Sequence, residues 1–303
     1  MSNQAQIDVC LCTFMRPELL KATLTSIERQ QLSPDINVKV IVVDNDANAS
    51  AEFVINEFKM RGLIDIVYDV EPEQNIALAR NRSVSMGKGD YVAFIDDDEV
   101  ASEIWLKQLL DCLHQYDADA VLGPVIPLYP PNAPSWAIEV GLVDRPNFKT
   151  GTTINFGRTG NTLVKRSLLE SYDGPFDPEF GLSGGSDSLF FRRAAKNGAK
   201  LIWCNESTVE EAVPPERMTF GFLKKRSFRG GQSYARIFLP AASFSEKIFW
   251  FLKRFIYTLT AILLWPLALI FGQKYLARVT RKLFLNLGQL SVLTGRYFYE
   301  YRK

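Results

Sequence analysis

Short apolar segments that alternate with helical stretches constrain the fold of this chain more than any other feature. The segments IDVCLCTF (7–14), VKVIVVDND (38–46), LIDIVYDV (63–70) and YVAFI (91–95) are almost continuously apolar, as expected for strands buried on both faces of a sheet. Because helical patterns separate these strands, they are expected to run parallel. The sequence therefore predicts an α/β fold with a mostly parallel sheet.

The intervening segments carry ordinary helix signals. Pro17 opens one helical pattern, which is a favourable position for proline, and Gly87 and Gly89 stop another. The predicted helices run from 17 onward and over about 50–61, 75–89 and 102–116. With 303 residues and 47% hydrophobic content, the chain is long enough to bury a large core in one domain or two.

The middle of the chain is less regular. The segment PLYPPNAPSW (127–136) is typical of a proline-rich surface connection, and FKTGTTINF (148–156) alternates like a strand. GRTGNTLV (157–164) is expected to be a glycine-bearing loop that returns to a short strand. In FGLSGGSDSLFFRRAAKNG (180–198), a glycine pair immediately precedes Asp187, and a helix is predicted to follow.

Polar residues collect at the carboxyl ends of three of the predicted strands: Thr13, Asp44 and Asp96–Asp98. Ligands of open parallel sheets bind beyond this edge. Three adjacent aspartates repel one another unless a positive charge lies among them, and hard divalent cations such as Mg²⁺ or Mn²⁺ take carboxylate oxygens. The alternative is a solvated acidic turn, but the convergence of strand ends favours the metal.

Composition and motifs exclude several kinds of site. The single histidine, His114, argues against a histidine-based zinc site and against a Ser-His-Asp triad. The four cysteines show no metal-ligand spacing and are expected to pack in the core in a reducing cytoplasm. Neither a GxGxxG motif after the first strand nor a P-loop motif occurs, and MSNQAQ does not open like a signal peptide. The chemistry is therefore expected to depend on carboxylates.

Seven motifs together resemble a known family. The chain contains, in order, CTFMR, VVDND, NIALARN, FIDDDE, GNTLVKR, GGSD and VPPERMT. This order resembles the inverting nucleotide-sugar glycosyltransferases of family 2, above all bacterial exopolysaccharide enzymes of the succinoglycan type, over about residues 7–235. The resemblance implies a single Rossmann-like catalytic domain of GT-A type, residues 1–235, which binds a UDP-sugar through Mn²⁺ or Mg²⁺ at a DxD motif.

The resemblance also implies roles for individual residues. Asp98 matches the metal ligand of the DxD motif, with Asp96 in the ribose or metal shell, and Asp187 matches the carboxylate that acts as the base. The residues expected to bind the nucleotide-sugar are Thr13, Arg16, Asp44, Arg80, Asp96 and Asp97. Two alternatives stay open: Asp187 lies where a helix N-cap is favoured, and Asp44 could be a plain turn residue at the end of its strand.

The segment after the expected base is basic. Cleavage of a sugar–phosphate bond leaves negative charge on the diphosphate, and arginine suits bidentate contacts with phosphate. Arg217 and Arg226, in VPPERMTFGFLKKRSFRGG (213–231), are candidates for contact with phosphate or acceptor. The alternative is a solvated basic helix.

The chain departs from the family pattern in two places. Ser186 precedes Asp187 where the family often has glutamate, so Asp187 lacks an acidic neighbour. The QxxRW stretch of processive members is also altered, because Gln232 is present but Arg236 is followed by Ile237 instead of tryptophan. Addition of a single sugar is therefore expected, not processive synthesis.

The predicted function is a metal-dependent inverting glycosyltransferase that moves a hexose from a UDP-sugar, with UDP-glucose the expected donor, to a lipid-linked saccharide. No nucleic acid partner is expected. One alternative is a nucleotidyltransferase, but CTFMRPELL lacks the Gly-rich loop typical of that class. The other is an inactive glycosyltransferase-like membrane scaffold, against which the intact Asp96, Asp98 and Asp187 argue.

The C-terminal region, residues 236–303, is expected to be helical and membrane-associated. FIYTLTAILLWPLALIF (255–271) is 17 residues without a charge, interrupted by Pro266 and flanked by basic residues. From Lys247 onward there are ten Lys and Arg against one acid, Glu300, which suits an anionic membrane surface. An interfacial arrangement on the cytoplasmic face of the bacterial inner membrane is expected; the alternatives are a single span and an ordinary buried hairpin.

Overall fold

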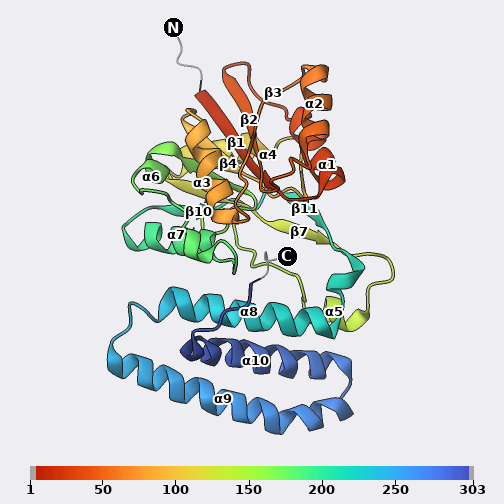
Figure 1. Ribbon diagram of the computed structural model, residues 1–303, viewed down its shortest axis with the longest axis vertical. Helices are drawn as coiled ribbons and strands as arrows, with labels where there is room; N and C mark the ends of the chain where they lie inside the picture. The colour runs from red at the N-terminus through yellow and green to blue at the C-terminus, as the bar shows by residue number, and fades with distance from the viewer. Residues whose placement is uncertain (1–4, 300–303) are drawn as a thin grey trace. The chain divides into compact units, whose positions relative to one another are not determined.

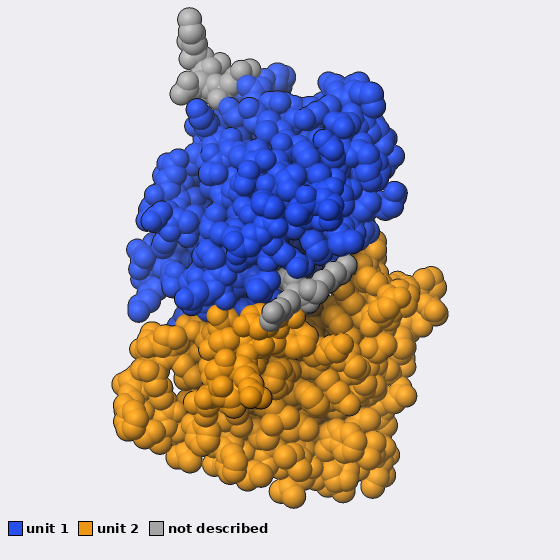
Figure 2. Space-filling view, in the orientation of Figure 1, with its two compact units in different colours: residues 1–126, 145–211, 301–303 blue, residues 127–144, 212–300 orange. Residues whose placement is uncertain are grey.

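The computed structural model describes residues 5–299, and its parts are shown in Figure 1. Within this range the chain divides into two compact units, coloured separately in Figure 2. Unit 1 comprises residues up to 126 and residues 145–211, and unit 2 comprises residues 127–144 and the chain from 212 onward. The predicted boundary after residue 235 differs from this division, because residue 235 lies inside a helix that belongs to unit 2.

Unit 1 contains, in the described part of the chain, an eight-stranded sheet with the order β3-β2-β1-β4-β9-β6-β10-β8. Neighbouring strands among β3, β2, β1 and β4 run parallel, and so do β6 and β10, whereas β9 is antiparallel to both of its neighbours and β8 is antiparallel to β10. The prediction of a mostly parallel sheet is confirmed. The strands are β1 (Ala5–Thr13), β2 (Ile36–Asp44), β3 (Asp65–Val70), β4 (Tyr91–Phe94), β6 (Ala120–Leu122), β8 (Thr153–Ile154), β9 (Thr162–Lys165) and β10 (Leu201–Trp203).

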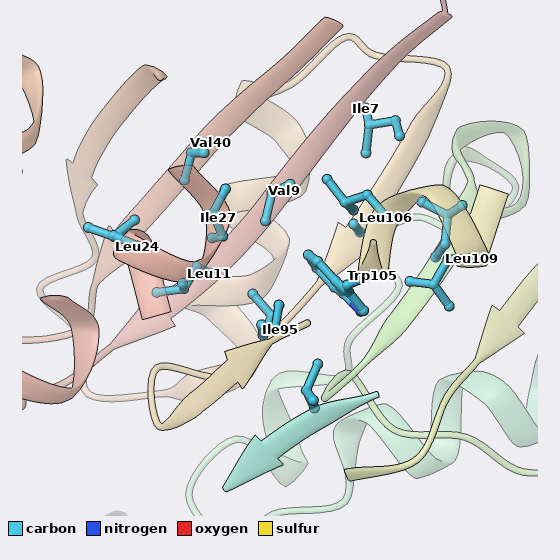
Figure 3. Packing of buried hydrophobic residues seen from close by; sticks show 14 of the residues in the cluster. Ile7, Val9, Leu11, Leu24, Ile27, Val40, Ile95, Trp105, Leu106 and Leu109 are labelled. Carbon is cyan, nitrogen blue, oxygen red and sulfur yellow. The ribbon is translucent and has the colours of Figure 1, made fainter. Parts of the chain in front are cut away.

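Helices cover both faces of this sheet (Figure 1). One buried cluster joins Val9 and Leu11 of β1 to side chains of α1, α2 and α4, and part of it is drawn in Figure 3. The other joins Cys10 of the same strand to side chains of α3, α6 and α7. Because successive side chains of β1 point to opposite covered faces, the whole strand has to be apolar. The helices are α1 (Pro17–Glu28), α2 (Glu52–Arg61), α3 (Ile76–Met86), α4 (Trp105–Gln115), α6 (Arg166–Glu170) and α7 (Ser186–Lys196).

Local signals fix the ends of these helices. Pro17 is the first residue of α1, as predicted. The side chain of Asn75 caps α3 by accepting hydrogen bonds from the backbone N–H groups of Ala77 and Leu78, and Gly87 follows its last residue. These caps set where Arg80, one of the predicted site residues, lies along α3.

The strand predicted over 148–156 is wrong in its length, because only Thr153–Ile154 pairs with the sheet, as β8. Gly151 has φ 85°, a left-handed conformation that interrupts an extended strand. A Cβ atom at Gly151 would lie 2.7 Å from the hydroxyl oxygen of Tyr116, so the close approach of the Tyr116 ring also requires glycine here.

A second, smaller sheet has the order β5-β11-β7, with β5 at Glu99–Ala101, β7 at Val125–Leu128 and β11 at Val209–Ala212. β5 and β11 are antiparallel, with Glu99 opposite Glu211. Glu99 directly follows the three aspartates, so this pairing brings Glu211 from far along the chain to the acidic run.

Unit 2 is helical apart from the ends of β7 and β11. Its helix α10 (Gln273–Ser291) lies between α8 (Phe220–Phe238) and α9 (Phe244–Ile270) (Figure 1). A Cβ atom at Gly231 or at Gly288 would collide with backbone of the facing helix, so α8 and α10 meet at their glycines. This packing explains why α8 belongs to unit 2. The shorter helices of unit 2 are α5 (Ser135–Glu139), η2 (Pro215–Arg217) and η3 (Val292–Thr294).

Candidate active site

The acidic run Asp96–Asp98 follows β4 and is held by Thr13, the last residue of β1, and by Arg16, which comes shortly after that strand. Thr13 Oγ1 donates a hydrogen bond of 2.8 Å to Asp97 Oδ2, and Arg16 Nη1 lies 3.2 Å from Asp97 Oδ1 and 3.2 Å from Asp98 Oδ2. The pairing of β1 with β4 is the reason that these residues meet, since both strands end at the same edge of the sheet. Burial raises the pKa of Asp97, while Arg16 and the hydroxyl of Thr13 oppose that rise.

Asp96 is the most exposed of the three aspartates, with 39% of its side chain accessible. Its Oδ1 lies 3.6 Å from Arg80 Nη2, and the Arg80 guanidinium also lies over the ring of Phe176, 5.9 Å from its centroid. The structure therefore brings together Thr13, Arg16, Arg80 and all three aspartates, which were predicted as site residues from distant parts of the sequence.

Asp98 is largely buried, with 14% of its side chain accessible. Burial, followed by the charges of Asp96, Glu211 and Asp97, raises its pKa to about 6, and Arg16 opposes this rise. A carboxylate that other carboxylates surround in this way is poised to accept a cation, because a cation relieves the repulsion.

Sequence reasoning missed the ion pairs that close the site on its other side. Arg145 Nη1 lies 3.1 Å from Glu99 Oε1, and Arg145 Nη2 lies 2.6 Å from Glu211 Oε2. The side chain of Glu99 has no accessible surface, and burial together with the Asp96 charge raises its pKa to about 8 against the effect of Arg145. The end of FIDDDE gave a signal for Glu99, but nothing in the sequence pointed to Arg145 or Glu211.

Gly160 lies against this cluster. In the antiparallel pairing of β4 with β9, Phe94 is opposite Thr162, which brings Gly160 toward Asp96. A Cβ atom at Gly160 would lie 2.5 Å from Glu99 Oε1 and 3.2 Å from Asp96 Oδ2. Only glycine fits without displacing these carboxylates, which gives a physical reason for the glycine of the GNTLVKR motif.

Asp44 is occupied within the protein. Its side chain is fully buried, Oδ1 accepts from the Asp46 N–H at 3.0 Å, and Oδ2 accepts from the Ala51 N–H at 2.8 Å and from the Tyr68 hydroxyl at 3.1 Å. These hydrogen bonds hold the loop between β2 and α2, which agrees with the alternative that Asp44 is a turn residue at the end of its strand. Some of these hydrogen bonds would have to break if Asp44 used the same lone pairs to contact a nucleotide.

Asp187 is the second residue of α7, and the N-cap of this helix is Gly185. The alternative that Asp187 is the N-cap is therefore wrong. Its Oδ1 accepts from the Ser188 N–H at 2.7 Å, and the side chain is half-buried. Gly184 and Gly185 have φ 80° and 106°, so the chain needs both glycines to turn into the helix.

The segment before Asp187 is tied to α3. The Asn75 amide, which is at the N-cap of α3, donates to the Pro178 carbonyl at 3.1 Å, where the 3₁₀ helix η1 (Pro178–Phe180) begins. A side chain at Gly181 would collide with Asn75. Phe176, beneath the Arg80 guanidinium, packs on Phe190 of α7 with ring centroids 5.5 Å apart. The same helix, α3, thus supports both Arg80 and the approach to Asp187.

Arg217 and Arg226, the predicted phosphate or acceptor contacts, belong to unit 2. Arg217 is the last residue of η2, and Arg226 lies on α8 with its guanidinium 5.8 Å from the ring centroid of Phe222. Their role stays a prediction.

The charges of the cluster fit a divalent cation. The carboxylates of Asp96, Asp97, Asp98, Glu99 and Glu211 outnumber the guanidinium groups of Arg16, Arg80 and Arg145, and they do so even when Glu99, whose pKa is about 8, is protonated. In residues 5–299, no three His, Cys, Asp or Glu side chains form a group that could hold a metal by themselves. Mg²⁺ commonly binds through one or two carboxylates plus substrate phosphates, so Asp96 and Asp98 suffice if a diphosphate completes the shell.

Known proteins are similar to this chain in sequence. The family model for glycosyl transferase family 2 matches residues 8–173. The chain is 36% identical over 243 residues to the succinoglycan biosynthesis protein ExoM of Rhizobium meliloti (strain 1021), covering 80% of this chain and 78% of ExoM. It is 27% identical over 243 residues to a glucosyl-dolichyl phosphate glucuronosyltransferase of Haloferax volcanii, covering 75% and 76% of the two chains.

Solved structures share the fold. The mannosyltransferase PcManGT from Pyrobaculum calidifontis, in complex with GDP-Man and Mn²⁺, aligns with a TM-score of 0.67 at 17% identity, over 97% of this chain and 89% of that one. S. aureus TarS 1-349 in complex with UDP aligns with a TM-score of 0.57 at 15% identity, over 97% and 93%. The fold is thus GT-A-like. With the family model and the identity to ExoM, it follows that the chain belongs to glycosyl transferase family 2 and is a glycosyltransferase.

Proposed function

We propose that this glycosyltransferase moves a hexose, with inversion, from a UDP-sugar to a lipid-linked saccharide in polysaccharide or glycoconjugate biosynthesis. The expected donor is UDP-glucose. The observation that carries the proposal is the acidic cluster at the end of β4, in which Asp96 and Asp98 face Arg80 and Arg16. Family membership sets aside the alternative of a nucleotidyltransferase.

The donor diphosphate is the group that this cluster suits. Asp98 and Asp96 would hold a Mn²⁺ or Mg²⁺ ion, which, when bound, stabilises the charge that develops on the leaving diphosphate. Arg16 and Arg80 would exchange their carboxylate partners for phosphate oxygens, for which the arginine fork is well shaped. Thr13 and Asp97 fix the position of the run, so that the two ligands are presented without rearrangement.

Asp187 is the proposed base. It would take the proton of the acceptor hydroxyl while the oxygen attacks the anomeric carbon and the UDP group departs with the bonding electrons. The carboxylate of Asp187 lies in the first turn of α7, at the positive end of the helix dipole.

The acceptor and location rest on the relatives and on the composition of unit 2. ExoM is named for succinoglycan biosynthesis, and the Haloferax relative is named for transfer to a glucosyl-dolichyl phosphate, which is a lipid-linked sugar. In the described residues, one helix, α9, is long and apolar enough to cross a membrane. We therefore propose that the enzyme works at an anionic membrane surface, on the cytoplasmic face of the bacterial inner membrane.

A donor panel tests this function. Purified full-length enzyme is incubated with radiolabelled UDP-glucose, UDP-galactose, UDP-N-acetylglucosamine and GDP-mannose, together with bacterial lipid extract. The expected result is a labelled lipid product from one UDP-sugar, with Mn²⁺ or Mg²⁺ and not with EDTA. Label transfer from GDP-mannose alone, or equal transfer in EDTA, would overturn the donor or the metal assignment. If the wild type transfers label from none of these donors although the acceptor is present in the lipid extract, the result would support the alternative of an inactive glycosyltransferase-like membrane scaffold.

A further inference from the structure

Helix α9 exposes apolar side chains along its whole length. The exposed ones cover the part of the helix circumference that does not face α10, and one row of them recurs every three or four residues. Leu263 is 73% exposed and Ile270 is 79% exposed. The row at the centre of this apolar face is Phe244, Ile248, Leu252, Ile256, Leu259, Leu263, Leu267 and Ile270, and it is flanked by further exposed apolar residues: Phe249, Phe251, Phe255, Tyr257, Ile262, Leu264 and Leu269.

The opposite face of α9 packs on α10 within unit 2. Its half-buried and buried residues also recur at helical spacing: Trp250, Arg254, Thr258, Ala261, Trp265 and Ala268. Trp265 Nε1 donates to Thr280 Oγ1 at 3.1 Å, and Arg254 Nη1 lies 3.5 Å from Asn286 Oδ1. These two pairs lock the helices together at points far apart along α9, so the two helices form one hairpin and not two independent segments.

This pairing decides between crossing a membrane and lying on it. If α9 crossed the bilayer, α10 would enter with it, because the hairpin contacts run through the middle of α9. Between its contacts with α9, at Thr280 and Asn286, α10 carries Arg281 and Lys282, and Arg278 lies one half-turn before. Charged side chains at the bilayer centre are costly and rare. The hairpin therefore resists a transmembrane arrangement that α9 alone would allow by length and composition.

The charges on the hairpin indicate which surface covers the apolar face. From Phe244 to Ser291 there are seven Lys and Arg and one acid, Glu246. Basic residues stand near both ends of the apolar stretch, at Lys253 and at Lys274, so a single span would leave one basic group on the far side of the membrane. An anionic membrane surface complements a basic hairpin with one apolar face.

We infer that α9 lies in the plane of an anionic membrane surface without crossing it, with the apolar face among the acyl chains and exposed basic side chains such as Lys247, Lys253 and Lys282 at the headgroups. This inference rests on the membrane association in the proposed function and fixes its geometry. It places both ends of α9 on the same, cytoplasmic side.

Labelling of both ends of α9 tests the geometry. Ser245→Cys and Gln273→Cys are expressed as full-length chains in bacteria, and intact spheroplasts are treated with a membrane-impermeant maleimide. The unmodified chain is the background control: Cys10, Cys112 and Cys204 are buried, and any reaction of the half-buried Cys12 is measured in it and subtracted. The account expects neither site to react in intact spheroplasts and both to react in inside-out vesicles. Reaction of one end only in intact spheroplasts would mean that α9 spans, and would overturn the inference.

Flotation with vesicles tests the surface. Wild type is expected to float with vesicles of phosphatidylglycerol and phosphatidylcholine and to float about tenfold less after Ile256→Gln/Leu263→Gln. Met60→Gln/Leu63→Gln is the matched control, because these residues are 82% and 70% exposed but belong to unit 1. Equal flotation of all three, or a stable dimer of wild type that ignores vesicles, would contradict the inference. Donor hydrolysis in detergent is measured in parallel, so a failure of the glycosyltransferase proposal is seen separately.

Discussion

Thr13, the last residue of β1, donates a hydrogen bond of 2.8 Å to Asp97, the middle aspartate of the acidic run, across 84 residues of sequence. Both partners are buried. The bond engages Asp97 inside the protein. This geometry supports the proposal that Asp96 and Asp98, on either side of it, are the ligands of a DxD motif and that Asp97 anchors the run.

Thr13→Val tests this anchor, because it keeps the shape of the side chain and removes the hydroxyl. The loss of one hydrogen bond to a buried charged acceptor is expected to lower the free energy of unfolding by about 1–3 kcal/mol. Urea denaturation measures the change. Thr25→Val is the control, since the Thr25 hydroxyl of α1 donates only to the Lys21 carbonyl one turn earlier, and it should change stability by less than about 0.5 kcal/mol. Equal effects of the two substitutions would contradict the anchor.

Arg145→Met tests the ion pairs behind the aspartates. Because Glu99 and Glu211 would stay buried without their partner, the free energy of unfolding is expected to fall by about 3 kcal/mol. Arg82→Met is a matched control. Arg82 also pairs with two carboxylates, Asp69 and Glu71, but is 38% exposed, so a change below about 1 kcal/mol is expected. A loss after Arg145→Met no larger than the control's would show that the buried pairs contribute little.

Two adjacent glycines of α8 are expected to respond in opposite directions to alanine. Gly231→Ala places a Cβ against the Leu285 carbonyl and 3.0 Å from the Gln289 nitrogen, so it should destabilise the packing of α8 on α10 by about 1–3 kcal/mol. Gly230→Ala meets no atom within 4 Å and should stabilise the helix by up to about 1 kcal/mol. Thermal unfolding of both variants in detergent measures this contrast. A destabilising Gly230→Ala, or a neutral Gly231→Ala, would speak against the helix packing described.

Asp187→Asn tests the base. The catalytic rate should fall by about 10²- to 10⁴-fold while the dissociation constant for UDP stays the same, because a base acts on the acceptor. Stability should change little, since Gly185 is the N-cap of α7. Asp173→Asn, at an exposed position of unit 1, is the control and should leave the rate unchanged. Full turnover by Asp187→Asn would remove this residue from the chemistry.

The sequence predicted the sheet well for a physical reason. β1, β2 and β4 are covered on both faces, so their residues are continuously apolar and the strands can be identified from the sequence alone. Thr13 and Asp96–Asp98 could be identified for the same reason, because they are polar residues at the ends of apolar segments. The length of the strand around residue 153 was predicted wrongly. The alternation of side chains in this segment does not reveal that the ring of Tyr116 lies against Gly151, where the chain turns.

The residues that complete the candidate site could not be predicted from the sequence pattern. Arg145 pairs with Glu99 and Glu211 across 46 and 66 residues, and no local spacing encodes such a meeting. Asp44 was predicted to contact the nucleotide, and in the structure its carboxylate accepts hydrogen bonds from its own loop, one of them from the Ala51 N–H seven residues later. Its contact with the nucleotide stays a prediction. A strand-end acid can face a ligand or fold its own loop, and the one-dimensional pattern is the same.

The central claim is that Asp96 and Asp98 hold a divalent cation that binds the donor diphosphate, and calorimetric titration of UDP tests it most directly. Wild type and Asp98→Asn are titrated with UDP in Mn²⁺ and in EDTA. The account predicts that wild type binds UDP at least about tenfold more tightly in Mn²⁺ than in EDTA, because the cation joins the carboxylates to the diphosphate. Asp98→Asn is expected to lose this gain, because an amide is a poorer metal ligand than a carboxylate. Equal affinity of wild type in Mn²⁺ and EDTA, or an undiminished Mn²⁺ effect in Asp98→Asn, would contradict it.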